Sequence, residues 1–175
     1  MEYLLPLKDR EEARTYPCDL MIKVRAYNQL DYTVQCVNSI LKNIPEGIKT
    51  EVVLFNHGSK DDTKEYFENM ESIRVINVAV NGIMPGVTNK VISRGKYCLF
   101  VSNDIVIGEN AIDNLYRCAV ENTDYGYIVP TTPAVSNLQA IPADYRSLEG
   151  FEEFAKRNNV YDPRRHEQRS RLWIP

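Results

Sequence analysis

The sequence is poor in the residues that build metal clusters and disulfide frameworks. It has two histidines, His57 and His166, and four cysteines without CxxC spacing: Cys18, Cys36, Cys98 and Cys118. A zinc site would need more closely spaced sulfur and nitrogen ligands than these residues supply. Reduced, buried thiols in a cytoplasmic protein are the expected state of the cysteines.

Long apolar runs and an excess of positive charge are also missing. No run approaches the roughly 20 apolar residues that a membrane helix needs. The first 17 residues, MEYLLPLKDREEARTYP, lack the basic start and apolar stretch of a secretory signal. The net charge of −3 predicts no nucleic-acid surface. The 175 residues, 43% of them hydrophobic, suit one domain with a core and are short for two.

What the sequence does contain is an alternation of strand and helix patterns over residues 19–130. Strands are expected over residues 19–27, 51–55, 74–78, 97–101 and 125–129. Helices are expected over residues 31–43, 61–70, 87–94 and 109–122. This order predicts an α/β fold with a mostly parallel sheet and helices on both faces.

The alternation also suggests how the chain is divided. Residues 1–18 read as an irregular lead-in, and residues 19–135 as one α/β domain. Residues 136–175 form a less regular extension, in which only residues 151–157 have a helical pattern.

Polar residues follow three of the expected strands. The first strand ends in Ala26-Tyr27-Asn28, the second in Asn56-His57-Gly58-Ser59 and the fourth in Ser102-Asn103-Asp104. Ligands of parallel α/β sheets bind at the carboxyl ends of strands. An aromatic ring can stack on a base, a polar loop can bind base or ribose, and a carboxylate can hold a hard cation between phosphates. The combination predicts a site for a nucleoside diphosphate.

Each of these residues also has an ordinary structural explanation. Tyr27 would be a packed aromatic residue, and Gly58 with Ser59 a turn. Asp61 would cap a helix, and Asp104 would be a turn residue at the end of a strand. Only their joint position at the strand ends favours a binding site.

These motifs resemble those of family 2 glycosyltransferases of the GT-A fold, which transfer sugars from nucleoside diphosphates. The resemblance covers about residues 19–135. Residues 25–28 (RAYN) stand where the family has Pro-x-Tyr-Asn, and residues 56–63 (NHGSKDDT) where it has Asp-Asn-Gly-Ser-x-Asp-Gly-Thr. Residues 102–104 (SND) stand at the DxD-type motif, and Asn89 lies where a helix of the family carries an asparagine.

The resemblance implies a role for each residue. Tyr27 would lie against the base, Asn56 and His57 would contact base or ribose, and Asn103 would reach ribose or diphosphate. Asp104 would hold Mn²⁺ or Mg²⁺, a Lewis acid that neutralises charge on the departing diphosphate. The implied donor-binding residues are Tyr27, Asn28, Asn56, His57, Gly58, Ser59 and Asn103.

The sequence departs from the family at three places. Arg25 replaces the usual proline, and either faces solvent or offers charge to a phosphate. Asn56 replaces an acidic residue, and Asp104 is the single carboxylate of the metal motif. No Glu-Asp pair follows Asp104 to act as the base of an inverting enzyme. The nearest carboxylates, Glu152 and Glu153, read as a solvated helix face.

Two hypotheses therefore remain for the function. The first is the donor-binding part of a metal-dependent, inverting glycosyltransferase of the cytoplasm, with a role in polysaccharide biosynthesis and an unknown acceptor. The second is a non-catalytic nucleotide-sugar-binding module of the same fold. A dehydrogenase is excluded because GxGxxG is absent, and a nucleotidyltransferase is disfavoured because residues 27–29 are not a Gly-rich basic loop.

Overall fold

The protein is described by a computed structural model over residues 16–78, 94–133 and 139–167. The chain packs as two compact units. Unit 1 comprises Met1–Asn38 and Glu46–Val106, and unit 2 comprises Ser39–Pro45 and Ile107–Pro175. The sequence suggests domain boundaries at residues 18 and 135. These boundaries stay predictions, because the two units are defined by how the chain packs and not by its sequence pattern.

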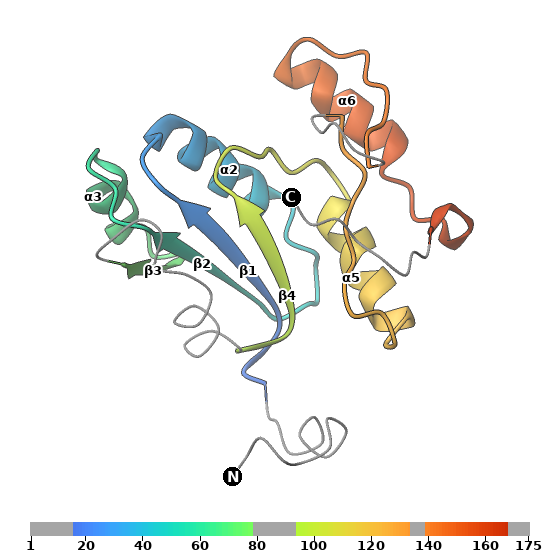
Figure 1. Cartoon of the computed structure of the whole chain (residues 1–175), viewed down its shortest axis with the longest axis horizontal. Coiled ribbons are helices and arrows are strands. Elements are labelled where there is room, and N and C mark those ends of the chain that lie inside the picture. Colours follow the sequence, from blue (N-terminus) through green and yellow to red (C-terminus); the bar gives the residue numbers. More distant parts are fainter. Residues whose placement is uncertain (1–15, 79–93, 134–138, 168–175) are drawn as a thin grey trace. The chain divides into compact units, whose positions relative to one another are not determined.

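Unit 1 is built on a four-stranded sheet in the order β3-β2-β1-β4 (Figure 1). The strands are β1 (Cys18–Ala26), β2 (Thr50–Asn56), β3 (Arg74–Asn77) and β4 (Gly95–Ser102). All neighbouring pairs run parallel, with β1 at the centre between β2 and β4. The predicted α/β fold with a parallel sheet is therefore confirmed, and four of the predicted strands form.

The core of the sheet is apolar because β1 and β2 are buried on both faces, as central parallel strands usually are. The register pairs Ile22 with Val52 and Val24 with Leu54, and all four side chains are buried. Gly95 begins β4 beside β1, where a β-carbon would lie 2.6 Å from the Met21 backbone nitrogen. Only glycine allows the two strands to approach this closely.

Two helices of the described chain begin in unit 1. Helix α2 (Leu30–Lys42) lies against the sheet (Figure 1), and α3 is a short helix over Thr63–Glu68. The buried side of α2 follows helical spacing through Thr33, Cys36, Val37 and Ile40. Residues 87–93 of the helix predicted over residues 87–94 lie outside the described residues.

Unit 2 contains α5 (Ala111–Glu121), α6 (Leu148–Asn158) and the 3-10 helix η2 (Pro163–Arg165). Helix α6 begins three residues before the helical pattern predicted over residues 151–157. The Ser147 hydroxyl accepts a hydrogen bond from the Gly150 amide and caps this additional first turn. The strand predicted over residues 125–129 is wrong. These residues are irregular and form no ladder with the described chain, and apolar alternation alone makes no strand without a hydrogen-bonding partner.

The turn between β1 and α2 stores backbone strain. Asn28 and Gln29 have φ angles of 54° and 62°, in the left-handed region that L-residues avoid. Asparagine tolerates this conformation better than glutamine does. We therefore expect Gln29→Gly to raise the free energy of unfolding by about 0.5–1 kcal/mol, the relief of strain less the entropy of a glycine. Urea denaturation would measure it, and Gln29→Ala, which keeps the strain, should give no gain.

Candidate functional site

The predicted site residues of the first and fourth strands meet at one edge of the sheet in unit 1. Arg25 pairs with Ser102 across β1 and β4, and the Asn103 amide donates to the Arg25 carbonyl at 3.2 Å. Tyr27 lies two residues after Arg25, and Asp104 lies two residues after Ser102. Both residues therefore follow their strands at the same position along the sheet edge. Tyr27 is 39% exposed and Asp104 is exposed, and no described residue forms a hydrogen bond or ion pair with the Asp104 carboxylate. Both side chains are accessible to a ligand.

Asn28 connects three loops of this edge through its own polar groups. Its amide donates to the Ser59 hydroxyl at 2.8 Å, and its Oδ1 accepts from the Lys60 amide at 2.8 Å. Its carbonyl accepts from Asn103 Nδ2 at 3.2 Å. The loops after β1, β2 and β4 are therefore fastened to one another at Asn28, which explains how its strained backbone is held in place.

Asn56 is committed to the loop that follows β2. Its side chain is only 2% exposed, and its Nδ2 donates to Asn77 Oδ1 at 2.9 Å. Its Oδ1 accepts from the Ser59 amide at 3.0 Å across Gly58, whose φ of 71° makes the tight turn. In this arrangement Asn56 shapes the loop and presents Ser59, while its own amide is satisfied inside the protein.

Asp61 joins the loop after β2 to the start of α2. Its Oδ2 accepts from the Leu30 amide and its Oδ1 from the Thr63 amide, both at 3.2 Å. Burial alone would raise the pKa of this carboxyl, but hydrogen bonds from Thr63 and Leu30 outweigh it and lower the pKa. Asp61 of the neighbouring loop thus satisfies the first backbone amide of α2, at Leu30.

His57 is the buried titratable group of the site. Its side chain is 1% exposed, its backbone amide donates to the Ala26 carbonyl at 2.8 Å, and its Nδ1 has no hydrogen-bond partner among the described residues. Burial, with the charge of Arg25, lowers the pKa of the imidazole. A neutral ring with an unpaired nitrogen can accept a hydrogen bond from a ligand or a water molecule.

The lowered pKa of His57 makes stability depend on pH. In the unfolded chain this histidine titrates near its ordinary pKa of about 6.5, whereas the folded state resists the proton. Stability should therefore fall as pH drops below about 6.5, because the unfolded state then binds more protons. We expect His57→Gln to flatten the decrease in unfolding free energy between pH 7 and 5, measured by urea titration. His166→Gln, which changes the other histidine, should keep the His57 part of the decrease.

Thr33 is the member of the site that sequence reasoning missed. It is fully buried in the first turn of α2, and its hydroxyl accepts from Asn103 Nδ2 at 2.8 Å. The hydroxyl donates in turn to the Gln29 carbonyl at 3.0 Å. The available signal was a polar residue on the otherwise apolar face of an amphipathic helix, since a buried hydroxyl requires a partner.

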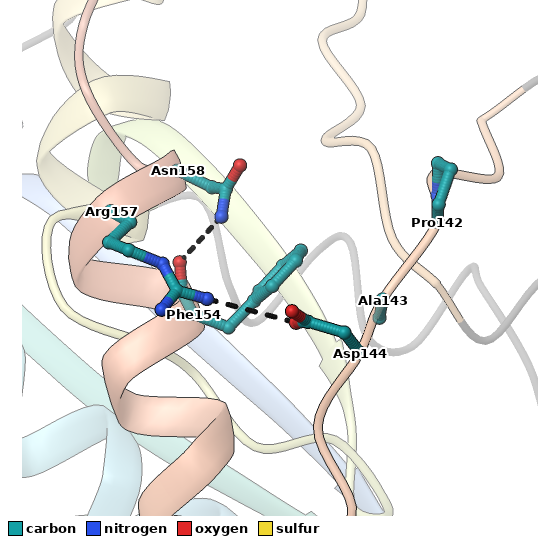
Figure 2. Close-up of a pocket in the computed structure, with 6 residues that line it drawn as sticks. All are labelled: Pro142, Ala143, Asp144, Phe154, Arg157 and Asn158. Carbon is teal, nitrogen blue, oxygen red and sulfur yellow. Dashed lines mark hydrogen bonds and ion pairs between the residues drawn. The ribbon is translucent and has the colours of Figure 1, made fainter.

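Unit 2 carries a separate pocket of about 390 Å³, which shares no residue with the polar loops of unit 1. Figure 2 shows the ring of Phe154 beside an ion pair in which Arg157 Nη2 lies 3.7 Å from Asp144 Oδ1. Both charged side chains are largely exposed, so the rim is open to solvent. The lining residues are Pro142, Ala143, Asp144, Phe154, Arg157 and Asn158.

Glu152 and Glu153, which the sequence places on a solvated helix face, are not buried as a general base would be. Glu152 forms an ion pair with Lys42, with 2.5 Å between Nζ and Oε1, and its side chain is about half exposed. Glu153 is also exposed. Within the described residues, no three His, Cys, Asp or Glu side chains cluster as a metal site, and no helix combines the length and hydropathy needed to cross a membrane.

Two curated proteins are similar to the chain over part of its length. Glycosyltransferase GlyG of Streptococcus pneumoniae serotype 4 (strain ATCC BAA-334 / TIGR4) is 31% identical over 104 residues, 56% of this chain and 34% of GlyG. Poly(ribitol-phosphate) beta-glucosyltransferase of Bacillus spizizenii (strain ATCC 23059 / NRRL B-14472 / W23) is 27% identical over 110 residues, 59% of this chain and 17% of that enzyme. The chain thus spans about a third of GlyG and less of the second relative.

Solved structures give a similar partial match. The crystal structure of S. aureus TarS 1-349 is 25% identical with a TM-score of 0.49, over 60% of this chain and 33% of TarS 1-349. The same protein in complex with UDP-GlcNAc is 26% identical with a TM-score of 0.49, over 60% of this chain and 32% of the other.

The family match extends over most of the chain. Residues 22–169 match the family described as Glycosyl transferase family 2. This range contains the second half of β1, all of β2 and β4, and the polar loops that follow these strands and carry the sequence motifs. The protein therefore belongs to glycosyl transferase family 2, and the resemblance seen in its motifs is confirmed.

Proposed function

We propose that the chain is the donor-binding part of a glycosyltransferase that transfers a sugar from a nucleoside diphosphate to an acceptor. One observation carries the proposal. Tyr27 and Asp104 follow paired strands at the same level of the sheet, and both are accessible. An aromatic ring and a carboxylate so placed can bind the two ends of a nucleoside diphosphate, the base by stacking and the phosphates through a cation.

The described residues suit a cation that is held jointly by Asp104 and by the phosphates of a bound nucleotide. Asp104 offers one unpaired oxygen-donor side chain, and no cluster of three possible ligands exists within the described residues. Mg²⁺ is usually held by one or two carboxylates together with substrate phosphates, and a cage made only of protein ligands is unusual for it. The cation, Mn²⁺ or Mg²⁺, would stabilise negative charge on the departing diphosphate.

The part played by this chain's own residues is binding and orientation. Tyr27 would support the base by stacking. The network around Asn28 holds the three loops in fixed relation before the donor arrives, which lowers the entropy lost on binding. An inverting reaction also needs a general base, and no Glu-Asp pair follows Asp104 in the sequence.

A second function is favoured by that last observation. With one carboxylate in the metal motif and Glu152 paired to Lys42, the chain could bind a nucleotide sugar without transferring it. The two functions can be separated with a longer protein, in which this chain is joined to the remaining part of a family member. Sugar transfer or hydrolysis of the donor by that protein would favour the enzyme, and binding without either would favour the binding module. The acceptor, a role in polysaccharide biosynthesis and the expected cytoplasmic location stay predictions.

Titration calorimetry of the chain with UDP, GDP, CDP and dTDP tests the donor site. Each nucleotide is titrated once with Mn²⁺ and once with EDTA. The proposal expects one nucleotide to bind more tightly with Mn²⁺, and that nucleotide names the donor class. If a folded chain binds none of the four under either condition, the donor-site proposal is contradicted.

A further inference from the structure

The side-chain amide nitrogen of Asn103 makes two hydrogen bonds inside unit 1. An amide nitrogen carries two hydrogens, and those of Asn103 are directed to Thr33 Oγ1 at 2.8 Å and to the Asn28 carbonyl at 3.2 Å. Its backbone amide donates to the Arg25 carbonyl at 3.2 Å. Asn103 is therefore fixed to β1, to the turn after β1 and to α2, and its nitrogen has no hydrogen left for a ligand.

The partner hydroxyl is fixed as well. Thr33 is fully buried, and its single hydroxyl hydrogen can be donated to the Gln29 carbonyl at 3.0 Å or to the Asn28 carbonyl at 3.5 Å. The oxygen then has a lone pair directed to Asn103. Because this buried hydroxyl donates to the turn after β1 and accepts from Asn103, it ties the end of β4 to the first turn of α2.

A second side chain on the same face of α2 supports this geometry. The Cys36 thiol lies 3.4 Å from the Ser102 carbonyl, to which it donates. Thr33 and Cys36 are three residues apart, so they lie on one side of the helix. Residues 102 and 103 are therefore both anchored to α2, while Asp104, the next residue, is exposed and has no described partner.

We infer that Thr33, acting through Asn103, is the positioning residue that fixes the backbone from which the Asp104 carboxylate reaches the diphosphate-bound cation. The inference rests on the proposed function for the identity of the ligand, but the positioning itself is a property of the free chain. A carboxylate whose backbone is held in place before binding loses less entropy than one on a mobile turn. Thr33, Asn28 and Asn103 thus form a support beneath the exposed ligand-binding carboxylate.

The test begins with the free chain and needs no ligand. Backbone ¹⁵N relaxation should give Asp104 an order parameter above about 0.8 in the wild type and below about 0.6 in Thr33→Val, which keeps the shape but removes the hydroxyl. Thr33→Ser retains the hydroxyl and should restore the rigid value. Asn103→Ala, at a half-exposed position, provides a second variant should Thr33→Val fail to fold.

The second measurement is calorimetric binding of UDP with Mn²⁺ and with EDTA. Thr33→Val should reduce the Mn²⁺-dependent gain in affinity by about threefold to tenfold, the worth of one hydrogen bond, and leave the EDTA affinity nearly unchanged. A merely structural role would weaken both affinities or neither. If Asp104 stays rigid in both Thr33→Val and Asn103→Ala, the inference is wrong. If Asp104 loosens but the wild type binds no nucleotide, the positioning stands and the proposed function fails.

Discussion

Replacing Asp104 with asparagine should remove the Mn²⁺-dependent part of nucleotide binding and leave the metal-independent part in place. The substitution keeps the size of the side chain and its position after the Ser102-Asn103 turn. It removes the negative charge and one hard oxygen donor, which is what a divalent cation requires. Since no described residue pairs with this carboxylate, the loss should not be confused with the loss of an internal contact.

The size of the effect follows from the small number of protein ligands. Loss of an outer-shell partner of a metal typically costs about 10–100-fold in affinity. Loss of the one carboxylate in the motif should therefore reduce the Mn²⁺-dependent affinity by at least about tenfold. Calorimetry of UDP with Mn²⁺ and with EDTA measures the two parts separately.

A matched control is available on the same unit. Asp62 is exposed, precedes α3 and makes no capping hydrogen bond with its side chain, so Asp62→Asn changes the net charge equally without touching the proposed site. It should leave the Mn²⁺ effect intact. Equal losses in both variants would mean that general electrostatic attraction, and not coordination by Asp104, produces the metal dependence.

The parallel sheet was predictable because each of its strands is signalled locally. The apolar runs of β1 and β2 and the Gly95 that precedes the β4 run are visible in the sequence, and the alternation with helices fixes their parallel direction. The segment over residues 125–129 has a similar local pattern but no strand partner in the described chain. Pairing is a long-range property, so a local pattern could not separate these cases.

The location of the candidate site could be predicted from the sequence, whereas the hydrogen bonds between its residues could not. Strand ends bring Tyr27, His57 and Asp104 to one edge of a sheet whatever the side chains do. Which asparagines face a ligand depends on hydrogen bonds between residues far apart in the sequence, such as Asn56 with Asn77 and Asn28 with Asn103. Sequence motifs give the residue type at each position, whereas the hydrogen-bonded partner is decided by tertiary packing.

Removing the ring of Phe67 should cause the largest loss of stability in unit 1. Phe67 is fully buried in α3, a helix of only six residues. A helix this short has little stability of its own, so its packing must hold it in place. Phe67→Ala should lower the free energy of unfolding by about 3–5 kcal/mol, a large part of the stability of a typical domain.

The neighbouring residue in the helix provides the control. The ring of Tyr66 is 43% exposed and packs edge-on against Phe67, with 5.0 Å between ring centroids. Tyr66→Ala should cost clearly less than Phe67→Ala, because the Tyr66 ring is already partly in water and the aromatic pair itself contributes only about 0.5–1.5 kcal/mol. Urea denaturation of both variants measures the difference, and similar losses would mean that α3 is held by its surface contacts.

Loss of the Phe67 ring should also weaken nucleotide binding at the candidate site. Helix α3 follows directly on the loop in which Ser59 and Asp61 bind the turn after β1, and the Asp61 carboxylate accepts a hydrogen bond from Thr63 in its first turn. If α3 detaches while the sheet remains folded, these bonds lose their support. Nucleotide binding by Phe67→Ala should then weaken even where circular dichroism shows that the chain is still folded. Unchanged affinity would show that the network around Asn28 holds the loops without the helix.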